Sequence, residues 1–295
     1  MRTLPVVFAL ASTLTFAHLA AAAVMACPSS ISSCGCTIVS SGYYELASDL
    51  SVTSASSDCI DIRAANVNLW LDGHSITGMG GGIGLHLLRS ASNAFVEGLD
   101  LSSGAFASIG SFTNGIQDDA SAAVIAHTNV SYNSNVGILL NHANGSLVSD
   151  FSAESNAYGV ELDASTLCSI QRVTLDSNSV YGLWLLSSSR NIVNFFEAQD
   201  NTVAGIYVGC QATAGPVGGR CAPSNRNHIY DGPQVGPAAA SQGYGVAIDS
   251  GSSGNVLAGI YGSGDATDDL DDQNAGCGSN VWFNNIGSRN ASCIH

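Results

Sequence analysis

The chain has 295 residues and a formal net charge of −15, because 23 acidic residues face eight arginines and no lysine. This balance excludes a basic face for phosphate groups, so we expect neither nucleic acid nor an anionic membrane surface as a partner. An apolar content of 45% is ample for one continuous core, and no proline-rich or charged linker divides the chain.

The first 26 residues have the pattern of a secretory signal peptide: Arg2, an apolar run to Leu19, and small residues up to Ala26. Cleavage after Ala23 fits as well as cleavage after Ala26, and Cys27 leaves a lipoprotein site open. We expect residues 27–295 to be secreted, periplasmic or on the cell surface, without a membrane span. They should form one domain, with 27–60 as an N-terminal cap and 61–295 as the body and C-terminal cap.

A repeat organises the middle of the chain. A glycine followed by an aliphatic residue recurs every 22 or 23 residues, and the glycines are Gly115, Gly137, Gly159, Gly182 and Gly205. Such a period indicates a solenoid. Within each unit apolar residues alternate with a period of two, which is strand spacing. We therefore expect an all-β, right-handed parallel β-helix of about twelve coils or fewer.

Stacked coils place equivalent residues about 4.8 Å apart. Asn156, Asn178 and Asn201 precede successive repeat glycines. We therefore expect their side-chain amides to form a hydrogen-bonded ladder at a turn.

Two stretches resemble a known superfamily. Residues 115–209 are similar to the repeats of pectate-lyase-like parallel β-helix proteins. The stretch Asn-Val-Asn-Leu-Trp-Leu-Asp-Gly-His-Ser-Ile-Thr-Gly at residues 66–78 resembles the first coil of many such secreted proteins. Periplasmic accessory proteins of nitrous-oxide reductase carry a similar coil. The resemblance covers roughly residues 42–295, and it implies a fold that hosts many functions.

Nine cysteines in an exported chain predict disulfides. We expect Cys210 to pair with Cys221 across a loop and Cys277 to pair with Cys293 at the C-terminal end. Four more cysteines should tie down the N-terminal cap: Cys27, Cys34, Cys36 and Cys59. Cys168 then remains as a free buried thiol. Zinc at Cys34 and Cys36 is the alternative for that pair.

Five carboxylates crowd one predicted loop: Asp265, Asp268, Asp269, Asp271 and Asp272. Calcium takes oxygen ligands, so this loop is a candidate calcium site. Its spacing does not follow the EF-hand pattern, and a solvated acidic loop is the alternative.

The repeat also indicates which side chains point outward. The first and third positions after each glycine should be inward, and the second and fourth outward. The outward positions carry Asp119, Asn141, Glu161, Asp163, Trp184 and Tyr207. Carboxylates beside exposed aromatic rings are suited to a sugar chain. We expect Asp119, Glu161 and Asp163 to act as acid and base, and Trp184, Tyr207 and Asn141 to bind the substrate.

Asp118 falls on an inward position, so either the register slips there or this coil is special. Asp118 and Asp119 are a partial match to the paired aspartates of polygalacturonases, whose histidine and lysine elements are absent. Asp119 and Asp163 should lie two coils, or about 9.6 Å, apart.

A second outward face precedes the asparagines. There Arg172 lies near Glu154 and Asp176. Pectate lyases of the superfamily use carboxylates to hold calcium and an arginine as base, so the resemblance implies an alternative site. An exposed ion-pair ladder, with Asp150 beside Arg172, explains the same residues.

Two classes of function remain at this stage. The first is a protein that binds or processes an extracellular polysaccharide on an outward strand face, as a lyase or glycoside hydrolase if it is an enzyme. The second is a non-catalytic surface, envelope or adhesion protein that uses the rod itself. The sequence predicts no cofactor other than calcium and does not specify an oligomeric state.

Overall fold

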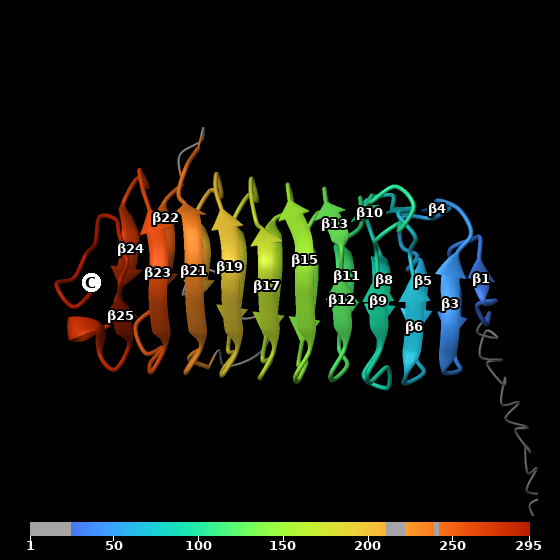
Figure 1. The fold of residues 1–295 in the computed structure, drawn as a ribbon, viewed down its shortest axis with the longest axis horizontal. Helices are drawn as coiled ribbons and strands as arrows, with labels where there is room; N and C mark the ends of the chain where they lie inside the picture. Colours follow the sequence, from blue (N-terminus) through green and yellow to red (C-terminus); the bar gives the residue numbers. More distant parts are fainter. Residues whose placement is uncertain (1–24, 211–221, 239–241) are drawn as a thin grey trace, which may run out of the picture.

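The structure is a computed structural model that describes residues 25–210, 222–238 and 242–295. The chain winds into a rod whose strands lie across its long axis, with the N-terminal coils at one end and the C-terminus at the other (Figure 1). The expected signal peptide falls almost wholly outside the described residues. No helix in those residues is long and apolar enough to span a membrane.

Two parallel sheets run along the rod. Sheet A has ten strands, in spatial order β2 (Cys36–Ile38), β5 (Ile60–Ile62), β8 (Ile83–Leu87), β11 (Asn114–Asp118), β14 (Val136–Asn141), β16 (Tyr158–Asp163), β18 (Tyr181–Leu186), β20 (Ala204–Val208), β22 (Tyr244–Ile248) and β24 (Asp268–Asp272). Each strand therefore pairs with its equivalent in the next coil, which confirms the all-β parallel solenoid with about ten turns.

Sheet B has fifteen strands. Its main path is β1 (Ser30–Ile31), β3 (Gly42–Leu46), β6 (Val67–Trp70), β9 (Phe95–Glu97), β12 (Val124–Ala126), β15 (Leu147–Glu154), β17 (Ser169–Thr174), β19 (Ile192–Ala198), β21 (His228–Val235), β23 (Val256–Gly262) and β25 (Val281–Phe283). A side branch contains β4 (Leu50–Ser51), β7 (Ser75–Thr77), β10 (Ala107–Gly110) and β13 (Thr128–Ser131). One 3-10 turn, η1 (Ala275–Cys277), lies near the C-terminus.

The long strands of sheet B bend at one residue each. Asp150, Arg172 and Phe195 have left-handed backbones there, with φ of 54°, 52° and 54°. In the preceding coil His127 (φ 55°) occupies the same row and separates β12 from β13. At this residue the strand changes direction, so one strand of sheet B forms two of the three sides of its coil.

The register of sheet A follows the repeat. Ile116, Ile138, Val160, Leu183 and Ile206 are paired in succession and are fully buried. Leu140, Leu162, Leu185 and Val208 follow two residues later and are also fully buried. The predicted inward positions are confirmed.

An amide ladder supports one turn of the rod. The Oδ1 atom of Asn178 accepts from the backbone N–H of Asn156 at 3.0 Å, and Oδ1 of Asn201 accepts from that of Asn178 at 3.0 Å. The predicted ladder is confirmed, and it extends to Asn133 at one end and to Gln242 at the other. The members satisfy backbone groups that water does not reach.

A second ladder was not predicted. It runs through Asn191, Asn227, Asn255 and Asn280 at another turn. Cys168 stands at its head, because its backbone N–H donates to Oδ1 of Asn191 at 2.9 Å. The thiol is buried and free, as predicted.

Three disulfides lie at the ends of the rod: Cys27–Cys36, Cys34–Cys59 and Cys277–Cys293. The C-terminal pairing and the use of four cysteines in the N-terminal cap are confirmed. Zinc at Cys34 and Cys36 is wrong, because both sulfurs are bonded to other cysteines. Cys221 lies outside the described residues, so its pairing with Cys210 stays a prediction. Such bridges fit an exported protein.

Candidate functional site

The outer face of sheet A carries polar and aromatic side chains in two rows. The first row follows the register through Asp61, His86, Gln117, Leu139, Glu161, Trp184 and Tyr207. The second row includes Asn141 and Asp163, which are paired in adjacent strands, with Asp119 beside them. This face therefore carries Asp119, Glu161 and Asp163, the three carboxylates that the sequence analysis proposed as acid and base.

Glu161 and Asp163 are neighbouring carboxylates on this face that lack hydrogen-bond donors in the described chain. They lie two residues apart on β16, so their Cα atoms are about 6.6 Å apart. In the described chain neither carboxylate accepts a hydrogen bond. Burial, and then the nearby charge of Asp163, raise the pKa of Glu161 to about 7. Burial also raises the pKa of Asp163, although His142 opposes that shift.

A carboxyl group with a pKa near 7 exchanges its proton readily at neutral pH, as a general acid must. A partly buried carboxylate without a hydrogen-bond partner costs stability. Such groups are enriched at functional sites. Glu161 is therefore the strongest candidate for a proton donor on this face, with Asp163 as the second carboxylate.

Aromatic rings pack beside this pair. Tyr158 stacks on Trp184 with ring centroids 5.3 Å apart, and Tyr181 stacks on Tyr207 at 4.9 Å. The expectation that Trp184 and Tyr207 are exposed is wrong, since they are only 6% and 7% exposed. They pack with Tyr181, Ala204 and Ala247 in a second apolar cluster outside sheet A. The sequence pattern predicted that both side chains point outward from sheet A, but it did not predict the layer of rings that covers them.

The N-terminal half of the face carries a polar network. Asp119 accepts from Nε2 of His86 at 2.9 Å, from Nδ2 of Asn141 at 2.7 Å and from Nε2 of Gln117 at 3.2 Å. Although burial opposes it, these donors keep the pKa of Asp119 below its ordinary value. The pairing along β11, β14 and β16 places Asp119 two coils from Asp163, as expected. Asp119 is therefore an ionised acceptor that fixes its neighbours.

The sequence analysis did not identify His86 or its neighbours Asp58 and Asp61. His86 follows Gly84, which precedes the next repeat glycine by 31 residues instead of 22 or 23. That long coil hides the alignment of His86 with Gln117. The signal that could have found it is the pairing of Gly84-Leu85 with Gly115-Ile116.

Asp118 points into the core without a register slip. It pairs with Leu87 and Leu140 and is fully buried. Its Oδ1 atom accepts from the backbone N–H of Ala120 at 2.9 Å, whereas Oδ2 is buried without a partner. Burial raises its pKa to about 6. The register slip is therefore wrong, and Asp118 is separated from the outer face.

The face of sheet B does not assemble the alternative site. Arg172 forms a two-pronged ion pair with Asp150 of the preceding coil, at 2.5 and 2.6 Å. Asp176 uses Oδ1 to accept from the backbone of Gln199 at 2.8 Å. Among the described residues Arg172 makes no hydrogen bond or ion pair with Glu154 or Asp176. The contacts are those of the expected ion-pair ladder.

The five acidic residues 265–272 do not form a projecting loop. Four of them lie on strand β24, and Asp269, Asp271 and Asp272 are buried. Asp272 accepts from Nε1 of Trp282 at 2.9 Å, and Asp269 accepts from backbone groups of Asp265 and Ser288. The predicted loop is wrong, because these carboxylates serve as acceptors at the C-terminal end of the rod. Calcium binding there stays a prediction.

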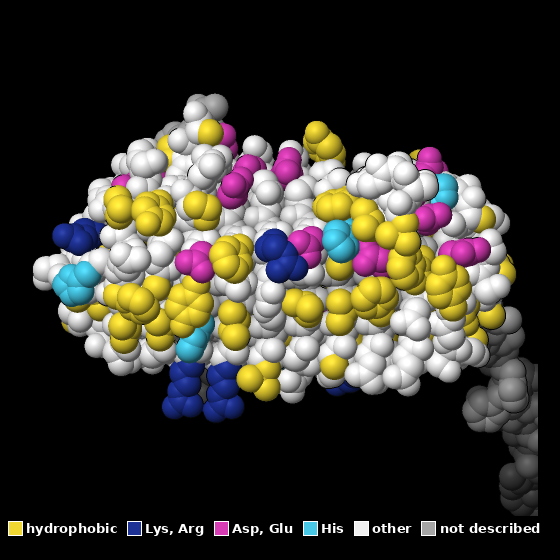
Figure 2. Space-filling model, in the orientation of Figure 1, with side chains coloured by type: hydrophobic (Ala, Val, Ile, Leu, Met, Phe, Trp, Pro, Cys, Tyr) yellow, Lys and Arg dark blue, Asp and Glu magenta, His cyan; other side chains and the backbone are white. Residues whose placement is uncertain are grey.

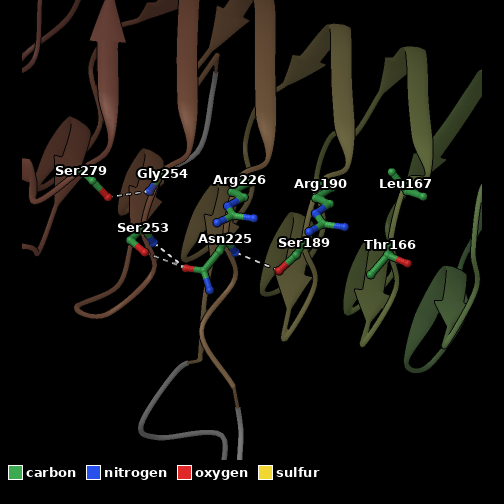
Figure 3. Close-up of a pocket in the computed structure, with 9 residues that line it drawn as sticks. All are labelled: Thr166, Leu167, Ser189, Arg190, Asn225, Arg226, Ser253, Gly254 and Ser279. Carbon is green, nitrogen blue, oxygen red and sulfur yellow. Dashed lines mark hydrogen bonds between the residues drawn. The ribbon is translucent and has the colours of Figure 1, made fainter.

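A groove with positive charge lies at a turn between the sheets (Figure 3). It has a volume of about 440 Å³, and its lining consists of Thr166, Leu167, Ser189, Arg190, Asn225, Arg226, Ser253, Gly254 and Ser279. The Arg190 and Arg226 side chains stand next to each other on neighbouring coils and point the same way. Neither guanidinium has an acidic partner within the described chain. Figure 2 shows how rare such basic groups are on the face that it displays.

Comparisons with known proteins agree with the fold. The family model of NosD, described as a periplasmic copper-binding protein, matches residues 100–214. A double mutant of the periplasmic alginate epimerase AlgG is similar at a TM-score of 0.59 and 14% identity, over 86% of this chain and 71% of that one. The Dettilon tailspike protein reaches a TM-score of 0.50 at 16% identity, over 84% and 52%. Among curated proteins no significant match is found.

The fold and these similarities together define the class: the chain is a parallel β-helix repeat protein. Soft copper ligands are scarce in the part that matches NosD. It contains no methionine, and burial raises the pKa of the Cys168 thiol to about 11. His127 contacts Glu97 and His142 contacts Asn141. In the described residues of this match no three metal-binding side chains come together.

Proposed function

We propose that this protein is exported and binds and processes an extracellular polysaccharide on the outer face of sheet A. Glu161 is the proton donor, and Asp163 is the second carboxylate. The observation that carries the proposal is the Glu161 carboxyl group, which is partly buried, has no hydrogen-bond partner in the described chain and has a pKa of about 7. AlgG, a similar parallel β-helix protein, is an epimerase of the polysaccharide alginate, which supports this class of substrate.

The geometry fits acid–base chemistry on a glycosidic chain. Glycoside hydrolases hold their two carboxyl groups about 5 to 9.5 Å apart. Side chains at positions i and i+2 of one strand fall in this range, at about 6.6 Å between Cα atoms. Tyr158 is half-buried beside Glu161 and is stacked on Trp184, so it offers an apolar ring edge to a sugar. A lyase would use the same pair to remove and return a proton.

The test is a screen of neutral and uronate-containing polysaccharides with the mature protein. Reducing ends report hydrolysis, and ultraviolet absorbance reports unsaturated products. Glu161→Gln and Asp163→Asn should each lower turnover by at least about 100-fold, the lower end of the usual contribution of an acid or base. The control Glu154→Gln, on the face of sheet B, should retain full turnover. Full turnover by the Glu161→Gln, Asp163→Asn double variant would refute the assignment.

A second candidate function is non-catalytic binding of an anionic polysaccharide in the groove of Arg190 and Arg226. The observation in its favour is the pair of guanidiniums without acidic partners, in a chain of net charge −15. Both residues have left-handed backbones, with φ of 62° and 58°, which asparagine tolerates. This function would be favoured if the parent protein binds an anionic glycan array but turns over no glycan, and if the Arg190→Asn, Arg226→Asn double variant no longer binds.

A further inference from the structure

Three metal-binding side chains meet on the outer face of sheet A, near the N-terminal end of the rod. Asp58 precedes β5, Asp61 lies on β5, and His86 lies on the neighbouring strand β8 in register with Asp61. One ligand atom from each residue lies within 4.8 Å of the other two. Within the described residues this is the one group of three histidine, cysteine or carboxylate side chains with such a geometry.

The hydrogen bond to Asp119 selects one tautomer of a neutral His86 ring. Nε2 lies 2.9 Å from Oδ2 of Asp119 and donates to it, because an ionised carboxylate can only accept. In the neutral ring Nδ1 then carries a lone pair. That atom faces Oδ1 of Asp61 at 3.9 Å, which is too long for a hydrogen bond. Two acceptor atoms therefore face each other without a donor between them.

The carboxylate of Asp61 is itself only partly satisfied. Its Oδ1 atom is buried and has no hydrogen-bond partner. The opposite oxygen has Arg63 at 3.6 Å, and that guanidinium is largely exposed. Asp58 stands beside Asp61 and is held in place, because its Oδ1 accepts from the backbone N–H of Ile83 at 2.7 Å. Two carboxylates and an imidazole lone pair thus converge without a matching positive charge between them.

A further shell of residues orients the imidazole. Asp119 accepts from His86 and is held in turn by Asn141 at 2.7 Å and by Gln117 at 3.2 Å. A carboxylate on the far nitrogen is the usual support of a metal-bound histidine, since it fixes the ring and makes the other nitrogen more basic. Nothing in the fold requires this chain of hydrogen bonds, since it lies outside the core.

We propose that Asp58, Asp61 and His86 bind one divalent transition-metal ion, with zinc as the probe. One imidazole and two carboxylates suit zinc, which takes nitrogen and oxygen ligands and four-coordinate geometry. Calcium takes six to eight oxygen ligands and has little use for an imidazole. Three protein ligands leave a fourth position for water or for an oxygen of a bound molecule.

This site is independent of the proposed polysaccharide chemistry. It shares the face of sheet A with Glu161, but the two lie three coils apart, or about 14 Å at one strand spacing per coil. It also lies outside residues 100–214, the part that matches NosD. Loss of metal binding and loss of turnover are therefore separate outcomes.

The experiment uses tag-free mature protein, stripped with a chelator and titrated with zinc by calorimetry. We expect one zinc ion per chain. His86→Ala and Asp61→Asn should each lower the affinity by more than about 10-fold, since each removes a ligand. Asp119→Asn removes the positioning carboxylate and should lower it by about 10- to 100-fold. The matched control is His74→Ala, which alters another histidine–aspartate pair, 3.4 Å from Asp49, and should bind as the parent does.

Cobalt gives a readout that requires no variant. Cobalt bound by the unmodified protein should show the visible absorption of a low-coordinate nitrogen and oxygen site, and zinc should displace it. Three results would overturn the proposal: no saturable zinc binding by the stripped protein, zinc binding that His86→Ala leaves unchanged, or calcium binding in preference to zinc. If His86 is protonated instead, its Nδ1–H faces Oδ1 of Asp61 without a metal, and the stripped protein should show no saturable zinc binding.

Discussion

Replacement of Glu161 by glutamine should stabilise the protein by an amount that grows above pH 4.5 and levels off above about pH 7. Burial raises the pKa of Glu161 from the ordinary 4.5 to about 7 in the folded chain. The folded chain therefore holds this proton more tightly than the unfolded chain does. Its contribution to stability is complete below pH 4.5 and is lost as the pH rises through about 7. At pH 8 the ionised, partly buried carboxylate opposes folding.

The size of the effect follows from the pKa shift. One pKa unit corresponds to about 1.4 kcal/mol, so a shift from 4.5 to about 7 gives an upper limit of roughly 3.5 kcal/mol at pH 8. Urea unfolding at pH 4.5 and pH 8 gives the free energy of unfolding of Glu161→Gln and of the parent, and their difference at each pH measures the effect. Several other carboxyl groups titrate as well, and this difference removes their contribution.

The control for this prediction is Glu154→Gln, on the face of sheet B, which should show the same small difference at both pH values. The reasoning is refuted if Glu161→Gln changes the free energy of unfolding equally at pH 4.5 and pH 8. It is also refuted if the variant is less stable than the parent at pH 8. Either result would mean that the carboxylate has a partner in solution that the structure does not show.

Three further predictions concern the rod. Asn178→Ala removes the acceptor of the buried Asn156 N–H and a donor to the buried Ala153 carbonyl, so it should cost about 2 to 6 kcal/mol by urea unfolding, whereas the part-exposed Asn129→Ala should stay within about 0.5 kcal/mol. Peptide mapping without reduction should recover the bridges Cys27–Cys36, Cys34–Cys59 and Cys277–Cys293, with Cys168 alkylated only after unfolding; a cross-linked Cys168 would contradict its place in the second ladder. Arg172→Gln should leave the urea midpoint close to that of the parent, and closer still at high salt, since its ion pair with Asp150 is exposed; a clear loss of stability would give that pair a structural role.

The repeat was enough to predict the fold and the inward positions. A period of 22 or 23 residues fixes which residues stack, and burial follows from alternation along a strand, as at Val160 and Leu162. The same logic gave the amide ladder, because equivalent residues of adjacent coils must be neighbours. These features depend on local spacing, which a single sequence displays directly.

Features that depend on what covers a face were not predictable in this way. Trp184 occupies an outward position, yet a layer of rings buries it. The acidic run 268–272 has the composition of a loop, but it forms a strand. Its carboxylates accept hydrogen bonds from donors in residues 280–290. His86 escaped notice because its coil is longer than the repeat.

The amide ladder has a consequence for the history of the molecule. Each rung donates its backbone N–H to the next coil and accepts the same kind of donor from the previous one, as Asn156, Asn178 and Asn201 do. A duplicated coil would therefore find a matching surface on both sides and lengthen the rod by about 4.8 Å. An insertion of one residue within a strand would instead invert every following side chain. Duplication of whole coils therefore preserves the register. It would extend the outer face of sheet A and leave the existing rows of side chains in place.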